Sequence, residues 1–371
     1  MKFTVSTKPL QDAINLAIIN SNVSKFYRKS CIVQISAIDN VLQLNVEASD
    51  ICSMVRLNGE NDSEGTATVF VDSLIFKQLV STFDSNSTTI SFLENGITLI
   101  SGSSKFDLPK LVDSEEVDFI EPYDVSVSQN DVEGPYDINK ANWKYVKEHQ
   151  MFALADTLIT PVYKRVYVGG EDGNVIVGDY DNSLFTHTVG CEFTNPCLLS
   201  DTVINLFTTI PDNSKYYKHN DNYIIYADTD AYKFISEFTP KYESDEGIGS
   251  YNSETILRIM RTPTSDFAKV DASSVSKYLG QLDILSKGPD ATVKFTVEGN
   301  TLKVSNKSSV KNFTISGDCP DFNAEFKSSY LKSVLSNYPN EISIAPMKQD
   351  DEVTGIVTWD DRLVTVLGSV E

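Results

Sequence analysis

Alternating apolar and polar positions mark three similar segments of the chain, at residues 32–47, 165–178 and 292–305. In each segment, two alternating runs flank a short turn, at Asp39-Asn40, Asp172-Gly173 or Gly299-Asn300. This arrangement is typical of a β-hairpin. Because the turns recur at intervals of about 130 residues, the sequence predicts three similar domains in a row.

Each predicted domain also holds two amphipathic helices, recognised by apolar residues three and four positions apart. They are expected at residues 8–19, 73–83, 139–154, 201–210, 273–285 and 327–337. Asp72 and Ser200 precede two of them as predicted N-caps, and Trp143, Val146, Gln150 and Leu154 form the buried stripe of the third. Antiparallel strands follow every helix, including a hairpin expected to turn at Asn95-Gly96. Helices on one side of antiparallel sheets predict an α+β fold of six helix-plus-strands units.

Charged or glycine-rich segments separate the repeats. Residues 112–131 and 240–253 are predicted linkers, which gives domains at 1–118, 132–243 and 265–371. The chain of 371 residues is long enough for each domain to bury its own core. We therefore expect three independent cores.

Composition narrows the class of protein. No apolar run is long enough to span a bilayer, and the N-terminus begins as an alternating strand, so we expect a cytoplasmic protein. The five cysteines are scattered and form no CxxC pair, which predicts reduced core residues and no zinc site. The net charge of −21 lowers the expectation of DNA binding. It does not exclude a basic face, because charges more than about 8 Å apart in water are screened.

Catalytic patterns are missing from the sequence. The three histidines, His149, His187 and His219, show no metal-ligand spacing, and no hydrolase or nucleotide-binding motif occurs. Asp179 and Asp181 lack the glycine and distal glutamate of a calcium loop, so we interpret them as turn residues. The sequence predicts a protein that is not an enzyme and needs no cofactor or metal. A hydrolase that uses the Asp-rich turns is the alternative.

The repeat order and length resemble the bacterial DNA polymerase sliding clamp, the β processivity subunit. The chain begins MKFTV before an amphipathic helix, and residues 104–109 (SKFDLP) resemble the edge strand before the family's first linker. Val270-Asp271, followed by a helix ending in Ile284-Leu285-Ser286, resembles the opening of its third domain. The resemblance implies a homodimeric ring of six domains with the DNA clamp fold. Such a ring encircles duplex DNA without reading its sequence and tethers a DNA polymerase after a clamp loader has placed it.

Basic residues on the predicted helices are candidates for contact with DNA phosphates. Lys140, Lys144 and Lys147 share one helical face by their spacing. Residues 201–210 offer no lysine and depart from this pattern. The resemblance adds the two loops around residues 25–28 and 164–167. The predicted DNA-binding residues are Lys25, Arg28, Lys77, Lys140, Lys144, Lys147, Lys164, Arg165, Tyr167, Lys277 and Lys332. A solvated surface role is the alternative for each lysine taken singly.

The resemblance also implies two apolar contact sites. A dimer interface would use Phe106 and Leu108 of one copy with Ile284 and Leu285 of the other. A pocket for short peptides of partner proteins would use Val168, Leu184, Pro263, Val366 and Leu367. Ordinary core packing is the alternative for all of these residues.

The pocket motifs depart from the family at residues 179–184 and 366–369, as expected of a distant or viral member in a bacterial cytoplasm or a phage-infected cell. The competing function is an acidic scaffold, built from repeats, that binds proteins and never DNA. A monomer without salt-sensitive DNA affinity would favour the scaffold.

Overall fold

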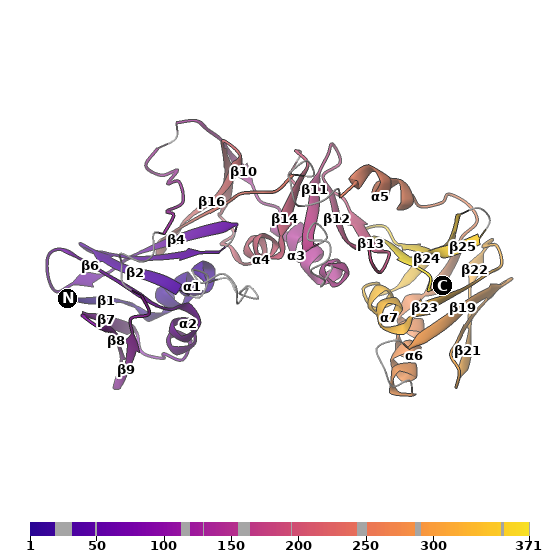
Figure 1. Ribbon diagram of the computed structural model, residues 1–371, viewed down its shortest axis with the longest axis horizontal. Coiled ribbons are helices and arrows are strands. Elements are labelled where there is room, and N and C mark those ends of the chain that lie inside the picture. The colour runs from indigo at the N-terminus through magenta and orange to yellow at the C-terminus, as the bar shows by residue number, and fades with distance from the viewer. Residues whose placement is uncertain are drawn as a thin grey trace. The chain divides into compact units, whose positions relative to one another are not determined.

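Six copies of one unit, a strand followed by a helix and three more strands, account for most of the computed structural model (Figure 1). The structure describes residues 1–18, 32–48, 50–112, 119–128, 130–154, 164–193, 195–242, 251–285, 291–349 and 352–370. Every named strand pair in these ranges is antiparallel, and the predicted α+β class is confirmed.

The first predicted domain contains two units. The first is β1 (Lys2–Ser6), α1 (Thr7–Ala17), β2 (Ile32–Ile38), β3 (Val41–Glu47) and β4 (Ile51–Asn58), with the short β5 (Glu60–Asn61) after it. The second is β6 (Thr66–Asp72), α2 (Ser73–Ser81), β7 (Ser87–Leu93), β8 (Gly96–Ser101) and β9 (Ser104–Pro109). Asp72 caps α2 as predicted, since its carboxylate accepts the Ile75 N–H at 2.8 Å.

The β7–β8 hairpin turns one residue earlier than expected. Leu93 pairs with Gly96, so Glu94-Asn95 forms the turn and Gly96 already belongs to β8. Gly96 has a φ of +147°, and a side chain there would lie 2.1 Å from the carbonyl oxygen of Leu108. The glycine is required by the close approach of β9 and not by the turn.

The middle of the chain supplies the third and fourth units. The third is β10 (Val132–Asp137), α3 (Lys140–His149), a 3₁₀ turn (Met151–Ala153), β11 (Arg165–Gly169), β12 (Asn174–Asp179) and β13 (Leu184–Thr188). The fourth is β14 (Cys197–Ser200), α4 (Asp201–Thr209), β15 (Lys215–His219), β16 (Asn222–Asp228) and β17 (Tyr232–Phe238). Trp143, Val146 and Gln150 are buried as expected, although α3 ends at His149, before residue 154. Ser200 caps α4 through the Val203 N–H.

The last two units are preceded by an additional helix, α5 (Ser253–Ile259), which begins where the predicted linker 240–253 ends. The fifth unit is β18 (Ala268–Asp271), α6 (Ala272–Leu285), β19 (Thr292–Glu298), β20 (Thr301–Ser305) and β21 (Val310–Thr314), followed by the short β22 (Ser316–Gly317). The sixth is β23 (Phe322–Lys327), α7 (Ser328–Ser336), β24 (Glu341–Gln349), β25 (Glu352–Trp359) and β26 (Val364–Gly368).

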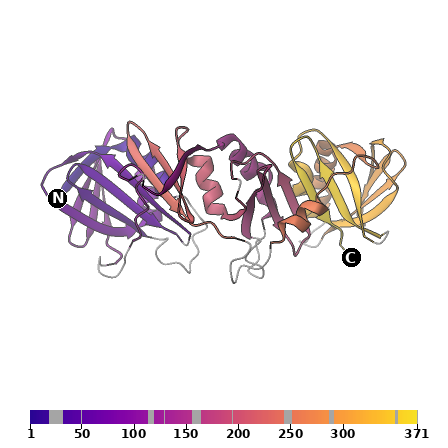
Figure 2. The same ribbon diagram turned by 90° about the horizontal axis from the view of Figure 1, so that it is seen from above.

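Two of the four sheets contain a seam, where the last strand of one unit pairs with the last strand of another (Figure 2). In the order β10-β15-β16-β17-β4-β3-β2-β6, the seam joins β17 to β4. In the order β14-β11-β12-β13-β26-β25-β24-β18-β22, it joins β13 to β26. The other two sheets, β5-β1-β7-β8-β9 and β21-β20-β19-β23, end at β9 and β21. Among the described strands, nothing pairs with the outer edge of either one.

The seams explain how the chain divides into compact units. Residues 1–141 with 200–240 form one unit, and residues 142–199 with 241–371 form the other. The middle predicted domain is split between them, because β15–β17 continue the sheet of β4 and β11–β13 continue the sheet of β26. The boundaries 1–118, 132–243 and 265–371 therefore remain a prediction from the sequence repeat.

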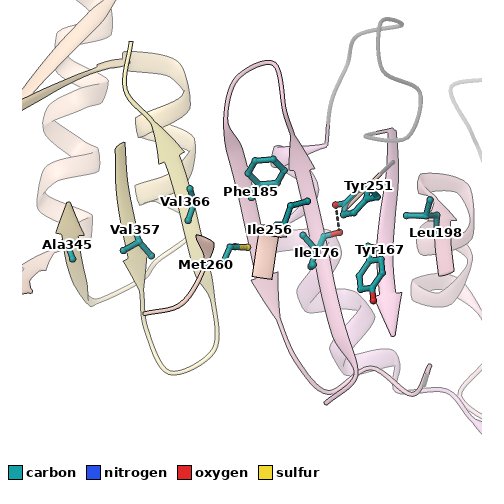
Figure 3. Close-up of a cluster of buried hydrophobic side chains, with 10 residues drawn as sticks. All are labelled: Tyr167, Ile176, Phe185, Leu198, Tyr251, Ile256, Met260, Ala345, Val357 and Val366. Carbon is teal, nitrogen blue, oxygen red and sulfur yellow. Dashed lines mark hydrogen bonds between the residues drawn. The ribbon is translucent and has the colours of Figure 1, made fainter. Parts of the chain in front are cut away.

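The helix α5 covers an apolar sheet face in the second compact unit (Figure 3). Ile256 and Met260 pack on Phe185, Val366 and neighbouring strand residues. Tyr251, which precedes the helix, is fully buried and donates its hydroxyl proton to the Ile176 carbonyl at 3.2 Å. The helix thus closes the face on which residues of β13 and β26 meet across the seam.

The described part of the first predicted linker crosses the sheet of the first compact unit. Two sheet carboxylates accept its backbone N–H groups, Glu47 from Ile120 at 3.2 Å and Glu237 from Tyr123 at 2.7 Å. Arg56 forms an ion pair with Asp124 in the same segment. Polar contacts with the sheet, together with the stacking of Phe119 on Phe70, hold residues 119–124 without a helix.

The described cysteines are buried and free, as the sequence predicts. Burial raises the pKa of the Cys52 and Cys197 thiols to about 12 and that of Cys191 to about 11. Cys319 is likewise buried and its pKa is raised to about 11. Such thiols are poor nucleophiles at neutral pH.

Replacing Asp271 by alanine is expected to destabilise the protein by about 1 kcal/mol at neutral pH, because Asp271 caps α6. Its carboxylate accepts the Ser273 N–H at 3.0 Å and the Ser274 hydroxyl at 2.5 Å, and these bonds lower its pKa. The stabilisation is therefore present above the ordinary pKa near 4 and is lost as the pH falls through the lowered value. Urea unfolding of both proteins over a pH series measures the difference, and a gap that persisted in strong acid would contradict this origin.

Candidate nucleic-acid and partner interfaces

Three of the predicted DNA-binding lysines connect the helices of two consecutive repeated units. Lys77 of α2 donates to the carbonyl of Ile18, the C-cap of α1, at 2.6 Å. Lys140 of α3 donates at 2.6 Å to the carbonyl of Ile210, the C-cap of α4, and pairs with Asp212. A lysine at a helix C-terminus interacts favourably with the helix dipole and satisfies a terminal carbonyl. These two lysines thus have structural partners, and burial lowers the pKa of Lys77.

Lys332 has a comparable position between the fifth and sixth units. Its ammonium group lies 2.8 Å from the Asp283 carboxylate, so it joins α7 to α6. The same carboxylate accepts the Ser328 hydroxyl at 2.7 Å. Ion pairs of this exposure contribute little stability, yet they fix where the charge lies.

Lys144, Lys147 and Lys277 are the exposed members of the predicted set. Lys144 and Lys147 lie on α3 beside the buried Trp143 and Val146, whereas Lys140, predicted to share their face, is bonded to Ile210 and Asp212. Lys277 projects from α6, away from the buried Leu279 and Leu282. Within the predicted set, these three are the helix-borne cations classed as exposed.

The loop-borne candidates differ among themselves. Lys164 and Arg165 are half-buried at the start of β11, whereas Tyr167 is 5% exposed and stacks on Tyr251 with ring centroids 5.8 Å apart. Tyr167 belongs to the core under α5, so we do not retain it as a surface residue. Lys25 and Arg28 lie outside the described residues.

The predicted dimer residues occupy an edge strand and a helix end. Phe106 of β9 is half-buried and stacks on Phe83 at 5.8 Å, and Leu108 is buried. Ile284, in the last turn of α6, is 78% exposed. An isoleucine this exposed on an otherwise ordered helix is available for contact with another chain. The side chain of Leu285 lies outside the described residues.

The predicted peptide-pocket residues are largely covered. Val168, Leu184, Val366 and Leu367 are at most 2% exposed, and Pro263 is half-buried. Val366 packs in the cluster that α5 closes (Figure 3). The helix α5 was not predicted, although Asn252 followed by Ile256 and Ile259 provides a cap and a helical spacing. Tyr180, 65% exposed in the turn between β12 and β13, is the accessible aromatic residue next to these positions.

The turn of Asp179 forms its own hydrogen bonds. The two Asp179 carboxylate oxygens accept the Asp181 N–H at 3.0 Å and the Asn182 amide at 2.6 Å. His187 Nε2 lies 2.8 Å from Asn174 Oδ1, and burial lowers the pKa of this histidine. Within the described ranges, no group of three or more His, Cys, Asp or Glu could hold a metal ion.

Repeated units, seams and helix pairs of this kind define the sliding clamp fold, and the chain has that fold. Its solved counterparts are clamps of bacterial DNA polymerase III. The beta subunit from Thermotoga maritima superimposes with a TM-score of 0.79 at 15% identity over 100% of this chain and 99% of that one. The Caulobacter crescentus beta subunit gives 0.76 at 14%, and the Streptococcus pyogenes beta subunit gives 0.74 at 12%, each over 100% of both chains.

No family model and no curated protein matches the chain. The likeness therefore lies in the three-dimensional arrangement and spans the whole chain. None of the described helices is both long and apolar enough to cross a membrane.

Proposed function

We propose that two copies of this chain form a closed ring that encircles duplex DNA, slides along it and tethers a DNA polymerase. In this proposal the protein acts without catalysis, in the cytoplasm, and depends on a clamp loader to open the ring. The full-length match to the fold of polymerase III beta subunits supports this reading. The three domains would lie at 1–118, 132–243 and 265–371, as the repeat suggests.

The observation that carries the proposal is the pattern of seams. Six units provide six last strands, and four of them pair within the chain, as β4 with β17 and β13 with β26. β9 and β21 are left, and both are edges of incomplete sheets. An exposed edge strand is a template for pairing with another chain. Pairing β9 of one copy with β21 of the other, twice by symmetry, would complete the series and close a ring.

Contact with DNA would come from exposed cations on the helices. Lys144, Lys147 and Lys277 suit phosphate contacts, which position a protein without reading bases. The loop residues Lys25, Arg28, Lys164 and Arg165 would add to them. Because the ring would hold DNA by enclosure, these contacts can be few and can weaken as salt rises.

Polymerase and loader peptides would dock near the β13–β26 seam. Leu184, Val366 and Leu367 lie beneath the surface there, and Tyr180 and Pro263 lie closer to it. Because Val366 is covered, a partner peptide would bind a shallower site than a pocket lined by Val366 itself. Partner specificity in this chain would depend on Tyr180 and on the cover supplied by α5.

Retention on DNA tests the proposal. The protein, loaded onto a nicked circular duplex by a clamp loader, should remain bound through gel filtration and be released when a restriction enzyme linearises the circle. Release on linearisation distinguishes enclosure from ordinary affinity. Equal retention on the circular and linear forms, or a strictly monomeric protein, would reject the ring.

A further inference from the structure

The exposed surface of α3 carries lysine on one side only. Trp143 and Val146 are buried, and Lys144 and Lys147 lie to one side of them. On the other side, one turn apart, are the half-buried Tyr145 and His149, whose rings are 4.5 Å apart. The helix itself therefore supplies no lysine or arginine to that second side.

Arg362, from the turn before β26, lies against this second side. Its guanidinium carbon is 3.6 Å from the centre of the Tyr145 ring. The turn is held as well, because Asp360 Oδ1 accepts the N–H groups of Arg362 and Leu363, both at 2.8 Å. Both the backbone and the side chain of this arginine are thus constrained, although it comes from a segment far from α3 in the sequence.

A guanidinium stacked on an aromatic ring keeps its N–H donors in one plane, directed outward past the edge of the ring. Tyr145 remains a neutral phenol in this position, since burial, followed by the charge of Asp360, raises its pKa to about 12. Arg362 is exposed, and it borders a cavity of about 400 Å³ that Lys269 and Trp359 also line. A phosphate oxygen can therefore approach the donors, and little side-chain freedom remains to be lost when it binds.

We propose that Arg362, held on Tyr145, contacts a DNA phosphate and supplies the cation that α3 lacks on this side. The inference rests on the proposed clamp function and adds a residue to its DNA-facing surface. A backbone crossing α3 would meet Lys144 and Lys147 on one side of the helix and Arg362 on the other. The Arg–phosphate contact would be bidentate, which a lysine cannot reproduce.

Carboxylates surround the pair formed by Arg362 and Tyr145 in the sequence and at the cavity. Glu148, three residues after Tyr145, and Asp361, next to Arg362, are exposed. Glu341 lies 3.9 Å from Lys269, which lines the same cavity. These carboxylates repel phosphates and offset the attraction of the nearby cations for DNA. The contribution of Arg362 to binding therefore depends more on the direction of its N–H donors than on its charge. Arg362→Lys, which keeps the charge, should therefore behave like Arg362→Ala.

The test is equilibrium binding of the full-length chain to a fluorescein-labelled duplex, followed by anisotropy over a series of salt concentrations. Arg362→Ala is expected to weaken binding and to reduce the slope of log affinity against log salt by about 0.9, the value for one phosphate contact. Tyr145→Ala should produce the same change, because it removes the ring that holds the arginine. Arg258 in α5 is also exposed, so Arg258→Ala is the matched control and should leave the slope unchanged.

Two results would overturn the inference. An unchanged slope for Arg362→Ala, with normal retention of the variant on circular DNA, would reject the contact and leave the ring proposal intact. A full wild-type slope for Arg362→Lys would show that charge alone matters, which contradicts the stacked geometry. By contrast, wild-type protein without salt-dependent DNA affinity and without retention on circles would reject the clamp function itself.

Discussion

Replacing Ile284 by aspartate is expected to separate the proposed dimer into single chains. The residue is 78% exposed in the last turn of α6. The same helix lies beside the edge strand β21, since the rings of Tyr278 and Phe313 are 5.9 Å apart and the Tyr278 hydroxyl is 2.9 Å from Ser309 Oγ. If β21 pairs with β9 of a second copy, Ile284 becomes part of the apolar contact. A charge buried there without a partner should cost about 2 kcal/mol or more at each junction, roughly 30-fold in affinity.

Light scattering coupled to size exclusion measures the outcome, because a chain of 41.2 kDa and its dimer differ twofold in mass. Val127→Asp is the matched control, as Val127 is 80% exposed on the segment that crosses the sheet of the first compact unit. We expect the control to stay dimeric. An Ile284→Asp protein that kept the dimer mass at low concentration would place the junction elsewhere.

Truncating Trp143 to alanine is expected to lower the free energy of unfolding by about 3–5 kcal/mol, the usual range for a large buried aromatic residue. Trp143 is fully buried, donates its indole N–H to Glu192 at 2.8 Å, and meets the Phe193 ring edge-on at 6.0 Å. The variant loses the apolar contact and leaves a carboxylate oxygen without this donor. Because Trp143 anchors α3, the exposed lysines of that helix should also lose their fixed positions.

Urea unfolding followed by circular dichroism provides the measurement. Tyr180→Ala removes an aromatic residue that is 65% exposed, and its unfolding free energy should stay within about 0.5 kcal/mol of wild type. A decrease below about 1 kcal/mol for Trp143→Ala would show that α3 is anchored by other contacts. The variant's affinity for duplex DNA should fall together with its stability.

Local signals in the sequence predicted much of the fold. Asp72 and Ser200 act as caps because a cap needs only the N–H three residues later. All three repeated hairpins form, with Ile38 paired to Val41 and Glu298 to Thr301 across two-residue turns, whereas the middle one, Gly169 to Asn174, has a four-residue turn. Alternation and turn chemistry act over a few residues, so a single sequence suffices to recognise them.

The roles of the lysines could not be predicted in the same way. Lys77 and Lys140 were expected on exposed faces, but their acceptors, the carbonyls of Ile18 and Ile210, are 59 and 70 residues away. Helical spacing indicates which face of its own helix a side chain occupies. It does not indicate which backbone group of another helix lies next to that side chain. Arg362 was missed for the same reason, since its ring partner Tyr145 comes from another unit of the repeat.

The helix α5 shows how composition can conceal a short element. The predicted linker 240–253 is rich in acidic residues and glycine, and only the apolar spacing that begins at Ile256 distinguishes the next segment. A helix of seven residues is marginal in isolation and is stabilised by tertiary contacts. Here the contacts are those of Ile256 and Met260 with the sheet, which no pattern within the linker could indicate.

Because the described thiols are inaccessible, dyes can be attached at chosen positions to observe the proposed ring. Because Cys52, Cys191, Cys197 and Cys319 are buried and have raised pKa values, maleimide dyes should react with them slowly at neutral pH. With Cys31 changed to serine, a cysteine introduced on β9 and another on β21 would be the preferred labelling positions. Energy transfer between dyes at these two positions would then report, molecule by molecule, when a junction opens and when it reseals.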